Sequence, residues 1–293
     1  MTEEQTSTQG SRRSELKEPG GVTVLQRRLG ALASSKRTTV RRIQSLVANV
    51  ILCQMLPASA VKGGTGIKLR LGERLTRQTP DLDTAFRGGR EEFEDDLRRN
   101  LIEGWSDFTG DVVRGKQRPP GGVPVPYVMQ PFTVKLKYHG RPFTTVALEV
   151  GYDELAATEE PTELELSEEV KEIFAALGLS APTPVPVLPL HHQISQKLHA
   201  CTEPGNQRAH DLVDLQLLES MADDALVAST TQRLFAFRGQ HAWPANVIPA
   251  LNWRDLYAEA IDGIEGVVRP GLDEAVDWIN TVYIPRLVAS SES

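Results

Sequence analysis

The sequence predicts a mixed α/β protein of two lobes, a first lobe built around a sheet and a second lobe made of helices. Between residues 105 and 150 apolar and polar residues alternate, as they do in half-buried strands. On both sides of that region apolar residues recur every three or four positions, which is typical of helices. At 293 residues the chain is long enough for two lobes. We place a disordered leader over 1–20, the first lobe over 21–180 and the second over 181–293.

The first lobe begins with helices. Residues 1–20 are polar and end at a Pro-Gly-Gly sequence, which favours disorder. Residues 22–56 predict two helices, the second of which ends at Pro57. A further amphipathic helix is expected over 91–102, with one apolar stripe formed by Phe93, Leu97 and Leu101.

Strands and a connector follow these helices. We predict a strand at 111–113, a loop rich in Pro and Gly at 116–126, and a hairpin of strands 132–138 and 143–150. We interpret residues 152–187 as a connector with a helix over 167–177 and an extended proline-rich end. The second lobe is helical, with helices expected over 190–201, 207–220, 223–237, 253–264 and 271–287.

The composition is that of an ordinary soluble protein, with 40% hydrophobic and 24% charged residues. No apolar run approaches the ~20 residues that span a bilayer, so we expect a cytoplasmic protein. Cys53 and Cys201 lie in helical-looking stretches, which argues against a disulfide framework. The net charge is −7, yet residues 11–42 carry nine Lys or Arg against two Glu. This N-terminal basic block could receive an RNA backbone, and it is equally compatible with a solvated helix face.

Residues 62–83 join a glycine pair to two carboxylates. Gly63-Gly64 lets the backbone approach a ligand, and Thr65 is expected to cap a helix whose start offers N–H groups to an anion. Asp81 and Asp83 lie two residues apart on a predicted strand, so their side chains share one side. Each motif alone also fits an ordinary turn or a solvated strand end. Together they predict a phosphate-binding turn beside a magnesium site.

This segment resembles the AbiEii family of nucleotidyltransferase toxins, which includes the MenT toxins. The matching residues are Lys62-Gly63-Gly64-Thr65 with Leu69, followed by Arg77-Gln78-Thr79-Pro80-Asp81-Leu82-Asp83. The resemblance implies a bilobed, polymerase-β-like nucleotidyltransferase core with a small mixed sheet, followed by a helical C-terminal lobe. It further implies that Mg²⁺ is held by Asp81 and Asp83 and that an NTP is bound by Lys62, Gly63, Gly64 and Thr65.

A third carboxylate comes from the predicted hairpin. In its second strand Leu148 and Val150 share one face, which leaves Glu149 on the other. By the residues alone, Glu149 is a metal ligand or a surface acid near a strand end. The resemblance places a third acid on a strand in this region and favours Glu149 as a metal ligand, with Asp153 as the fallback.

A second group of charged residues lies between 194 and 218. Arg208, Asp211 and Asp214 recur every three residues and share a helix face, as in a salt-bridged surface helix. This block also resembles the AbiEii family, which carries a lysine in one helix and an arginine-x-x-aspartate-x-x-aspartate element in the next. We expect Lys197 to contact the triphosphate, and Arg208 to add a forked phosphate contact or simply to pair with Asp211 or Asp214. Asp211 is expected to orient Lys197 or the attacking hydroxyl, and Asp214 to be structural.

Four of the six histidines also fall in the second lobe: His191, His192, His199 and His210. Their spacing fits none of the compact zinc patterns, and neighbouring residues on a helix point about 100° apart. We expect these side chains to cap, to pack or to contact RNA.

The predicted function is therefore Mg²⁺-dependent transfer of NMP from an NTP to a hydroxyl. The resemblance implies that the acceptor is the 3′ end of tRNA, that its modification stops translation, and that the antitoxin is an AbiEi-like protein or a kinase. Neither DNA nor a membrane is expected as a partner. Phosphorylation of Thr79 would add about −2 charge beside Asp81 and is a candidate control. The alternatives are a small-molecule or protein acceptor, and a non-catalytic nucleotide-binding module of the same fold.

Overall fold

The computed structural model describes residues 16–79, 81–117, 128–266 and 269–291. Most of the leader predicted over 1–20 and most of the loop predicted over 116–126 lie outside these residues. The end of the predicted leader is included, and there the buried Pro19 accepts a hydrogen bond through its carbonyl from the Tyr138 hydroxyl at 2.7 Å. Within the described part of the chain, no helix is long and apolar enough to cross a membrane.

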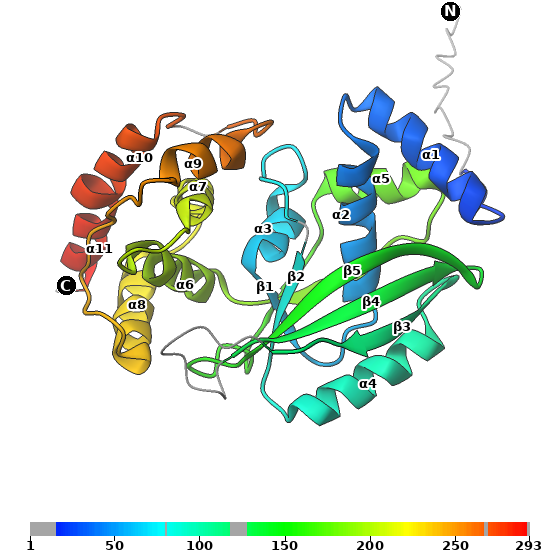
Figure 1. Cartoon of the computed structure of the whole chain (residues 1–293), viewed down its shortest axis with the longest axis horizontal. Helices are drawn as coiled ribbons and strands as arrows, with labels where there is room; N and C mark the ends of the chain where they lie inside the picture. Colours follow the sequence, from blue (N-terminus) through cyan, green and yellow to red (C-terminus); the bar gives the residue numbers. More distant parts are fainter. Residues whose placement is uncertain (1–15, 80, 118–127, 267–268, 292–293) are drawn as a thin grey trace, which may run out of the picture.

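The helices predicted for the first lobe are confirmed. They are α1 (Val22–Ser35), α2 (Val40–Cys53), α4 (Arg90–Glu103) and α5 (Glu168–Leu177). Thr39 caps α2 by accepting a hydrogen bond from the Arg42 backbone N–H, and Ser167 caps α5 in the same way. A short helix after the glycine pair, α3 (Gly63–Leu71), lies between the two lobes in Figure 1.

A seven-stranded mixed sheet forms the centre of the first lobe, in the order β3-β4-β5-β2-β1-β7-β6. The strands are β1 (Ala60–Lys62), β2 (Asp81–Phe86), β3 (Phe108–Arg114), β4 (Gln130–Tyr138), β5 (Arg141–Tyr152), β6 (Thr162–Leu164) and β7 (Val185–Val187). The predicted hairpin is the antiparallel pair β4–β5. The segment interpreted as a connector also supplies β6 and β7, since Val187 pairs with Val61 of β1.

The two faces of this sheet differ in polarity. On β4 and β5 every second residue, such as Val134 and Leu148, is buried in the core that α2 and α4 complete. The intervening residues include the exposed Lys135 and the half-buried Glu149, so they form an open face. Such alternation is usual for strands that bury one face only. The open face is therefore free to carry polar chemistry.

The second lobe is helical, as predicted. Its helices are α6 (Leu190–Thr202), α7 (Ala209–Leu218), α8 (Asp224–Arg238), α9 (Trp253–Ile261), α10 (Leu272–Trp278) and α11 (Ile284–Ser290), with the π-helical turn η2 (Ile279–Tyr283) between the last two. They enclose a second cluster of buried apolar residues. Ile67 of α3 belongs to that cluster, so the glycine-pair helix packs against the helical lobe. The mixed α/β fold class is confirmed, and the boundary at residue 180 stays a prediction.

Candidate active site

Three carboxylates project from the open face of the sheet. β2 and β5 are parallel, and their register places Asp83 opposite Glu149 and Leu82 opposite Leu148. Leu82 and Leu148 are fully buried. Because side chains alternate along a strand, Asp81, Asp83 and Glu149 all lie on the other side of the sheet. The structure thus brings together the three acids that the sequence offers as metal ligands.

The environment of these carboxyl groups disfavours their ionised form and raises their pKa values. Burial raises the pKa of Asp83. The charge of Lys62 lowers this pKa in part, and the charge of Asp81 raises it further. Burial also raises the pKa of Glu149, again with a contribution from Asp83 and then from Asp81. Burial raises the pKa of Asp81 as well, against the charge of Arg77. The open face therefore holds negative charge that lacks sufficient positive charge beside it.

Mg²⁺ fits this donor set, because it takes carboxylate oxygens and a bound cation relieves repulsion among acids. The three side chains do not converge on a single ion position. Among the residues that the structure describes, no three His, Cys, Asp or Glu side chains are close enough to hold an ion together. The fallback acid, Asp153, accepts a hydrogen bond from the Thr158 backbone N–H at 3.0 Å and serves its own turn.

The glycine pair is required by the closeness of α3 to the acids. Gly63 has φ of +63°, a conformation that side chains disfavour, and a Cβ there would lie 2.2 Å from Oδ2 of Asp83. A Cβ on Gly64 would lie 2.4 Å from the Thr79 hydroxyl oxygen. Lys62 pairs with Asp83 in the antiparallel register of β1 and β2. The start of α3 thus lies directly against the acids.

The prediction that Thr65 caps α3 is wrong. The N-cap is Lys62, and no side chain caps the helix. Thr65 lies inside the first turn, where its buried hydroxyl donates to the backbone carbonyl of Asp81 at 2.7 Å and accepts from Asn49 at 3.4 Å. The hydroxyl fastens α3 to the start of β2, so a contact from Thr65 to a nucleotide is restricted to its backbone N–H.

A buried ion-pair network lies in the helical lobe. The ammonium of Lys197 donates to Asp211 and to Asp214, each at 2.7 Å. The guanidinium of Arg208 donates to Asp211 at 2.7 Å, and Arg77 from the first lobe donates to Asp214 at 3.1 Å. Three cations therefore surround two carboxylates. Asp214, expected to be structural, contacts both Lys197 and a residue of the other lobe.

The charges of this network stabilise one another. Burial disfavours the charge on Lys197, but the charges of Asp211 and Asp214 outweigh it and raise the pKa of the ammonium. Burial disfavours the charge on Asp211 too, and Lys197 and Arg208 lower the pKa of its carboxyl below the usual range. The pKa of Arg208 is raised, chiefly by Asp211. Every member is ionised near neutral pH.

A cavity of about 230 Å³ joins the two halves of the site. Lys62, Gly63, Asp83 and Glu149 line it from the first lobe, and Lys197, Arg208 and Arg238 line it from the second. An anion in this cavity would meet cations from both lobes beside the open-face acids. The sequence-predicted residues on both sides of the connector therefore share one cavity.

Several residues that contribute to this site are not predicted from the sequence. Sequence reasoning gives Arg77 no role, although the family-like motif begins with that residue. It misses Arg238 and Glu154, which form a two-pronged ion pair between the lobes with distances of 2.7 and 2.8 Å. No local spacing signals that pair, because its members lie 84 residues apart. Only the interaction of the two lobes brings them together.

The histidines are packed rather than clustered around an ion position. His199 is 1% exposed and lies against Phe235 and His241, with ring centroids 4.7 and 4.5 Å apart. The rings of His191 and His192 are in tilted contact, with centroids 4.5 Å apart. Burial lowers the pKa of His192 to about 4, so this ring is neutral at physiological pH.

Thr79 is 7% exposed, and its hydroxyl has no hydrogen-bond partner among the described residues. It faces Gly64 closely, as the short distance to a Cβ built there shows. A modifying enzyme could reach this hydroxyl only if the segment before β2 moved. A negative group placed there would stand between the start of α3 and Asp81.

The N-terminal basic block is only partly available to a ligand. Arg42 pairs with the buried Glu73 at 2.6 Å, and Arg28 donates to the backbone carbonyl of Leu177 at 2.7 Å. Figure 1 shows α1 on the side of the first lobe away from the helical lobe. Exposed basic side chains remain at Arg27, Arg37 and Arg41.

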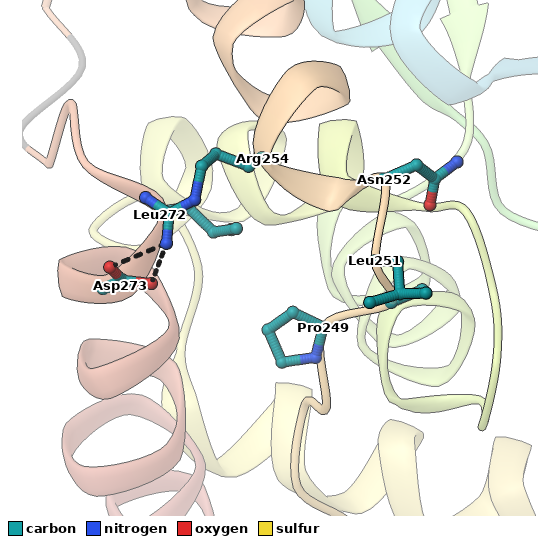
Figure 2. A pocket seen from close by; sticks show the side chains of 7 residues that line it. Pro249, Leu251, Asn252, Arg254, Leu272 and Asp273 are labelled. Atoms are coloured by element: carbon teal, nitrogen blue, oxygen red, sulfur yellow. Dashed lines mark hydrogen bonds and ion pairs between the residues drawn. The ribbon is translucent and has the colours of Figure 1, made fainter.

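A cavity of about 650 Å³ lies elsewhere, on the helical lobe around Pro249, Leu251 and Asn252. Figure 2 shows its only charged side chains, Arg254 and Asp273, paired with each other at 3.1 to 3.2 Å. In the part of the chain that the structure describes, no charged side chain besides this one ion pair lines it, whereas two acids and cations from both lobes line the smaller cavity. The smaller cavity between the lobes is therefore the one with the chemistry of an active site.

Comparison with solved structures agrees with this fold. MenT4, a nucleotidyltransferase toxin from Mycobacterium tuberculosis, is similar over 91% of this chain and 88% of its own, with 15% identity and a TM-score of 0.53. JHP933 from Helicobacter pylori matches over 84% of this chain and 90% of its own, with 15% identity and a TM-score of 0.45. A search of curated proteins finds no match.

The family comparison reaches further than the fold. A sequence profile for the family described as "Nucleotidyl transferase AbiEii toxin, Type IV TA system" matches residues 49–280. That range contains both charged motifs and the whole cavity between the lobes. The chain belongs to the AbiEii family of nucleotidyltransferase toxins of type IV toxin–antitoxin systems.

Proposed function

We propose that this protein transfers NMP from an NTP to a hydroxyl at the 3′ end of tRNA, in a Mg²⁺-dependent reaction that stops translation. One observation supports the proposal above the others. Asp83 and Glu149 on neighbouring strands line a cavity whose other wall carries Lys197 and Arg208, and Asp81 lies on the same face of β2 as Asp83. Nucleotidyl transfer needs both, because a metal must be held beside the α-phosphate and the departing pyrophosphate must be met by positive charge.

The first wall of the cavity would hold the metal and the phosphate chain. Asp81 and Asp83 are the proposed Mg²⁺ ligands, with Glu149 as the auxiliary one. Bound magnesium supplies Lewis-acid polarisation of phosphate oxygens and activation of the attacking hydroxyl. The backbone N–H groups at Gly63 and Gly64 begin a helix and suit phosphate oxygens, and Lys62 adds a cation at the same place.

The second wall would stabilise the charge that develops during transfer. As the acceptor oxygen bonds to the α-phosphorus, the bond to the pyrophosphate oxygen breaks and negative charge grows there. Lys197 and Arg208 lie on the cavity wall with their charge fixed by Asp211 and Asp214. Asp211 therefore acts as a positioning residue for Lys197, and the ammonium needs no rearrangement to meet the phosphate.

Incubation of the protein with Mg²⁺, each labelled NTP in turn and total tRNA tests the proposal. We expect label to enter tRNA with one or more nucleotides, to disappear with EDTA, and to disappear in Asp81→Ala. Transfer to no RNA under any of these conditions would contradict the tRNA proposal.

The nature of the acceptor can be tested separately. Arg27, Arg37 and Arg41 are exposed, and we expect their joint replacement by Gln to raise the KM for tRNA and to reduce its salt dependence. A small-molecule acceptor would leave both unchanged, and that result would favour the alternative acceptor class.

The antitoxin is proposed on family grounds, as an AbiEi-like protein or a kinase. For a kinase the proposed target is Thr79, whose modification would place a phosphate against Gly64 and beside Asp81. Mass spectrometry of the toxin before and after exposure to its cognate antitoxin checks this assignment, and an unmodified Thr79 in an inactivated protein would contradict it.

A further inference from the structure

Arg238 is the last residue of α8 and lies on the wall of the cavity between the lobes. Its Nε and one terminal nitrogen donate to the two oxygens of Glu154, at 2.8 and 2.7 Å. The other terminal nitrogen lies 3.1 Å from Nδ1 of His199. Gln196 donates to the same carboxylate at 3.0 Å. The guanidinium is thus held from two directions, by the first lobe and by α6.

The protonation of its neighbours fixes the direction of these contacts. Burial lowers the pKa of His199 to about 3, with the charge of Arg238 as the next contribution, so the ring is neutral. Its Nδ1 can therefore accept a hydrogen bond from Arg238. Burial disfavours the charge on Glu154, but the hydrogen bonds and charge of Arg238 outweigh it and lower the pKa of the carboxyl. Glu154 is an anion, and it engages one edge of the guanidinium.

A guanidinium has five N–H groups in a planar fork, and these contacts use three of them. Among the described residues no further partner is found for the other two N–H groups, one on each terminal nitrogen. Two such N–H groups can donate a pair of hydrogen bonds to two oxygens of a phosphate. The side chain is 23% exposed, so it is open to the cavity while its stem is packed. Lys62 and Lys197 line the same cavity.

We infer that Arg238 binds the phosphate chain of the nucleotide and that Glu154 and His199 are its positioning residues. The inference rests on the proposed function for the identity of the nucleotide, and on the contacts above for the phosphate site itself. An ion pair between Arg238 and Glu154 that only joined the lobes would not require Arg238 to line the cavity or to keep N–H groups available for a ligand. Preorganisation by Glu154 lets Arg238 bind phosphate with little loss of side-chain entropy.

The phosphate site is tested by binding, without turnover. The probes are inorganic tripolyphosphate and the matching nucleoside, titrated into the full-length protein and into Arg238→Gln and Arg238→Lys. We expect Arg238→Gln to weaken tripolyphosphate binding roughly 10- to 100-fold, the usual range for a lost charge-assisted contact. Arg238→Lys should recover only part of it, because an ammonium keeps the charge and loses the fork. Nucleoside binding should not change in either variant.

Glu154→Gln tests the positioning role. It removes the anion and keeps the shape, so we expect a smaller loss of tripolyphosphate affinity than in Arg238→Gln. In a transfer assay Arg238→Gln should raise the KM for NTP and leave the KM for the acceptor unchanged, a split that a merely loosened fold would not produce.

Arg286→Gln is the matched control. Arg286 also joins elements of the helical lobe, through Glu219 at 3.1 Å and Asp224 at 2.9 Å, and does not line the cavity. We expect wild-type tripolyphosphate binding in this variant. Unchanged binding in both Arg238 variants, or an equal loss in Arg286→Gln, would overturn the inference. Arg238-dependent phosphate binding in a protein that transfers no nucleotide would instead contradict the proposed function alone.

Discussion

Two groups of aspartates adjoin the same cavity and have opposite electrostatic surroundings. The first reaches the cavity wall through Asp83, and the second pairs with the wall residues Lys197 and Arg208. Asp81 and Asp83 stand on a strand with Glu149 beside them, and burial raises the pKa of each carboxyl. Asp211 and Asp214 lie deeper, at 0% and 1% exposure, yet their cationic neighbours outweigh burial and lower both pKa values. The first group lacks sufficient counter-charge within the protein, and the second has it in full.

This difference teaches how one residue type serves two purposes. Carboxylates that are neutralised by fixed Lys and Arg side chains hold a structure together and orient those cations. Carboxylates that lie near one another without a direct ion pair to a side-chain cation are suited to bind a cation from solution. The sequence spacing of the two groups, every second residue and every third residue, fits their strand and their helix equally well. The surrounding charge, not the spacing, separates the roles.

The largest expected effect follows from removing an open-face acid. Asp83→Asn should reduce nucleotidyl transfer by at least roughly 10³-fold, since metal stabilisation of the transition state is worth several kcal/mol. Because the change also relieves repulsion between buried acids, we expect no loss of thermal stability in metal-free buffer. Single-turnover rates and a melting curve for the same preparation measure both. A lower Tm with normal activity would reverse the roles assigned to the two groups.

Breaking the neutralised group should instead destabilise the protein. Asp214→Asn leaves Lys197 and Arg77 short of a buried counter-charge, and removal of one partner from such a network typically costs about 3–5 kcal/mol. Chemical denaturation at neutral pH measures this cost. Arg254→Gln, which breaks an exposed pair with Asp273, is the control and should stay within about 1 kcal/mol of wild type.

Lys197→Ala separates catalysis from metal binding. It should reduce transfer by roughly 10²- to 10³-fold, because the cation that meets the departing pyrophosphate is lost, while Mg²⁺ or Mn²⁺ binding at the open-face acids stays largely intact. Titration with Mn²⁺ followed by electron paramagnetic resonance measures the metal directly. Loss of metal binding in Lys197→Ala, to the extent seen in Asp81→Ala, would contradict the separation of the two groups.

The elements of this fold follow closely from local sequence, and their pairing does not. The apolar stripe of Phe93, Leu97 and Leu101 and the alternation across β4 and β5 are enough to predict α4 and the hairpin. The opposition of Asp83 and Glu149 depends on a parallel register between strands more than 60 residues apart in sequence, which no short pattern encodes. Family resemblance supplies that information indirectly.

Two misjudged segments show where local rules fail. Prolines at 182–186 predict an extended connector, but Pro186 lies inside β7, where the short strand tolerates a missing N–H. Thr65 has the residue type of a helix cap, yet in the structure its hydroxyl donates a hydrogen bond to the backbone carbonyl of Asp81 instead. A tertiary contact overrides a local preference at Thr65, whereas the prolines keep their extended conformation and only the pairing of β7 goes unpredicted. The Arg238–Glu154 pair is likewise a tertiary contact that local sequence does not encode.

A smaller effect is expected at Thr79, which lies against Gly64 and two residues before Asp81. Thr79→Glu should reduce transfer by about 10²-fold, because a further carboxylate beside Asp81 repels the triphosphate and competes for the metal. Thr79→Val is close in shape, and it should retain most activity because the hydroxyl has no hydrogen-bond partner among the described residues. Full activity in the Glu variant would rule out regulation by phosphate at this position.

The smallest expected effect concerns groups that the fold keeps neutral. Burial lowers the pKa of His199 to about 3, from an ordinary value of about 6.5. Below pH 6.5, therefore, His199 is protonated in the unfolded chain and stays neutral in the folded protein. His199 therefore contributes stability that is present above about pH 6.5 and is lost as pH falls toward 3, with a slope of at most about 1.4 kcal/mol per pH unit. His199→Gln should flatten the fall of the unfolding free energy between pH 6 and 4, measured by urea denaturation, relative to wild type. An unaltered slope in His199→Gln would mean that the fall comes from other histidines, chiefly His192 and His210, since burial lowers the pKa of each to about 4.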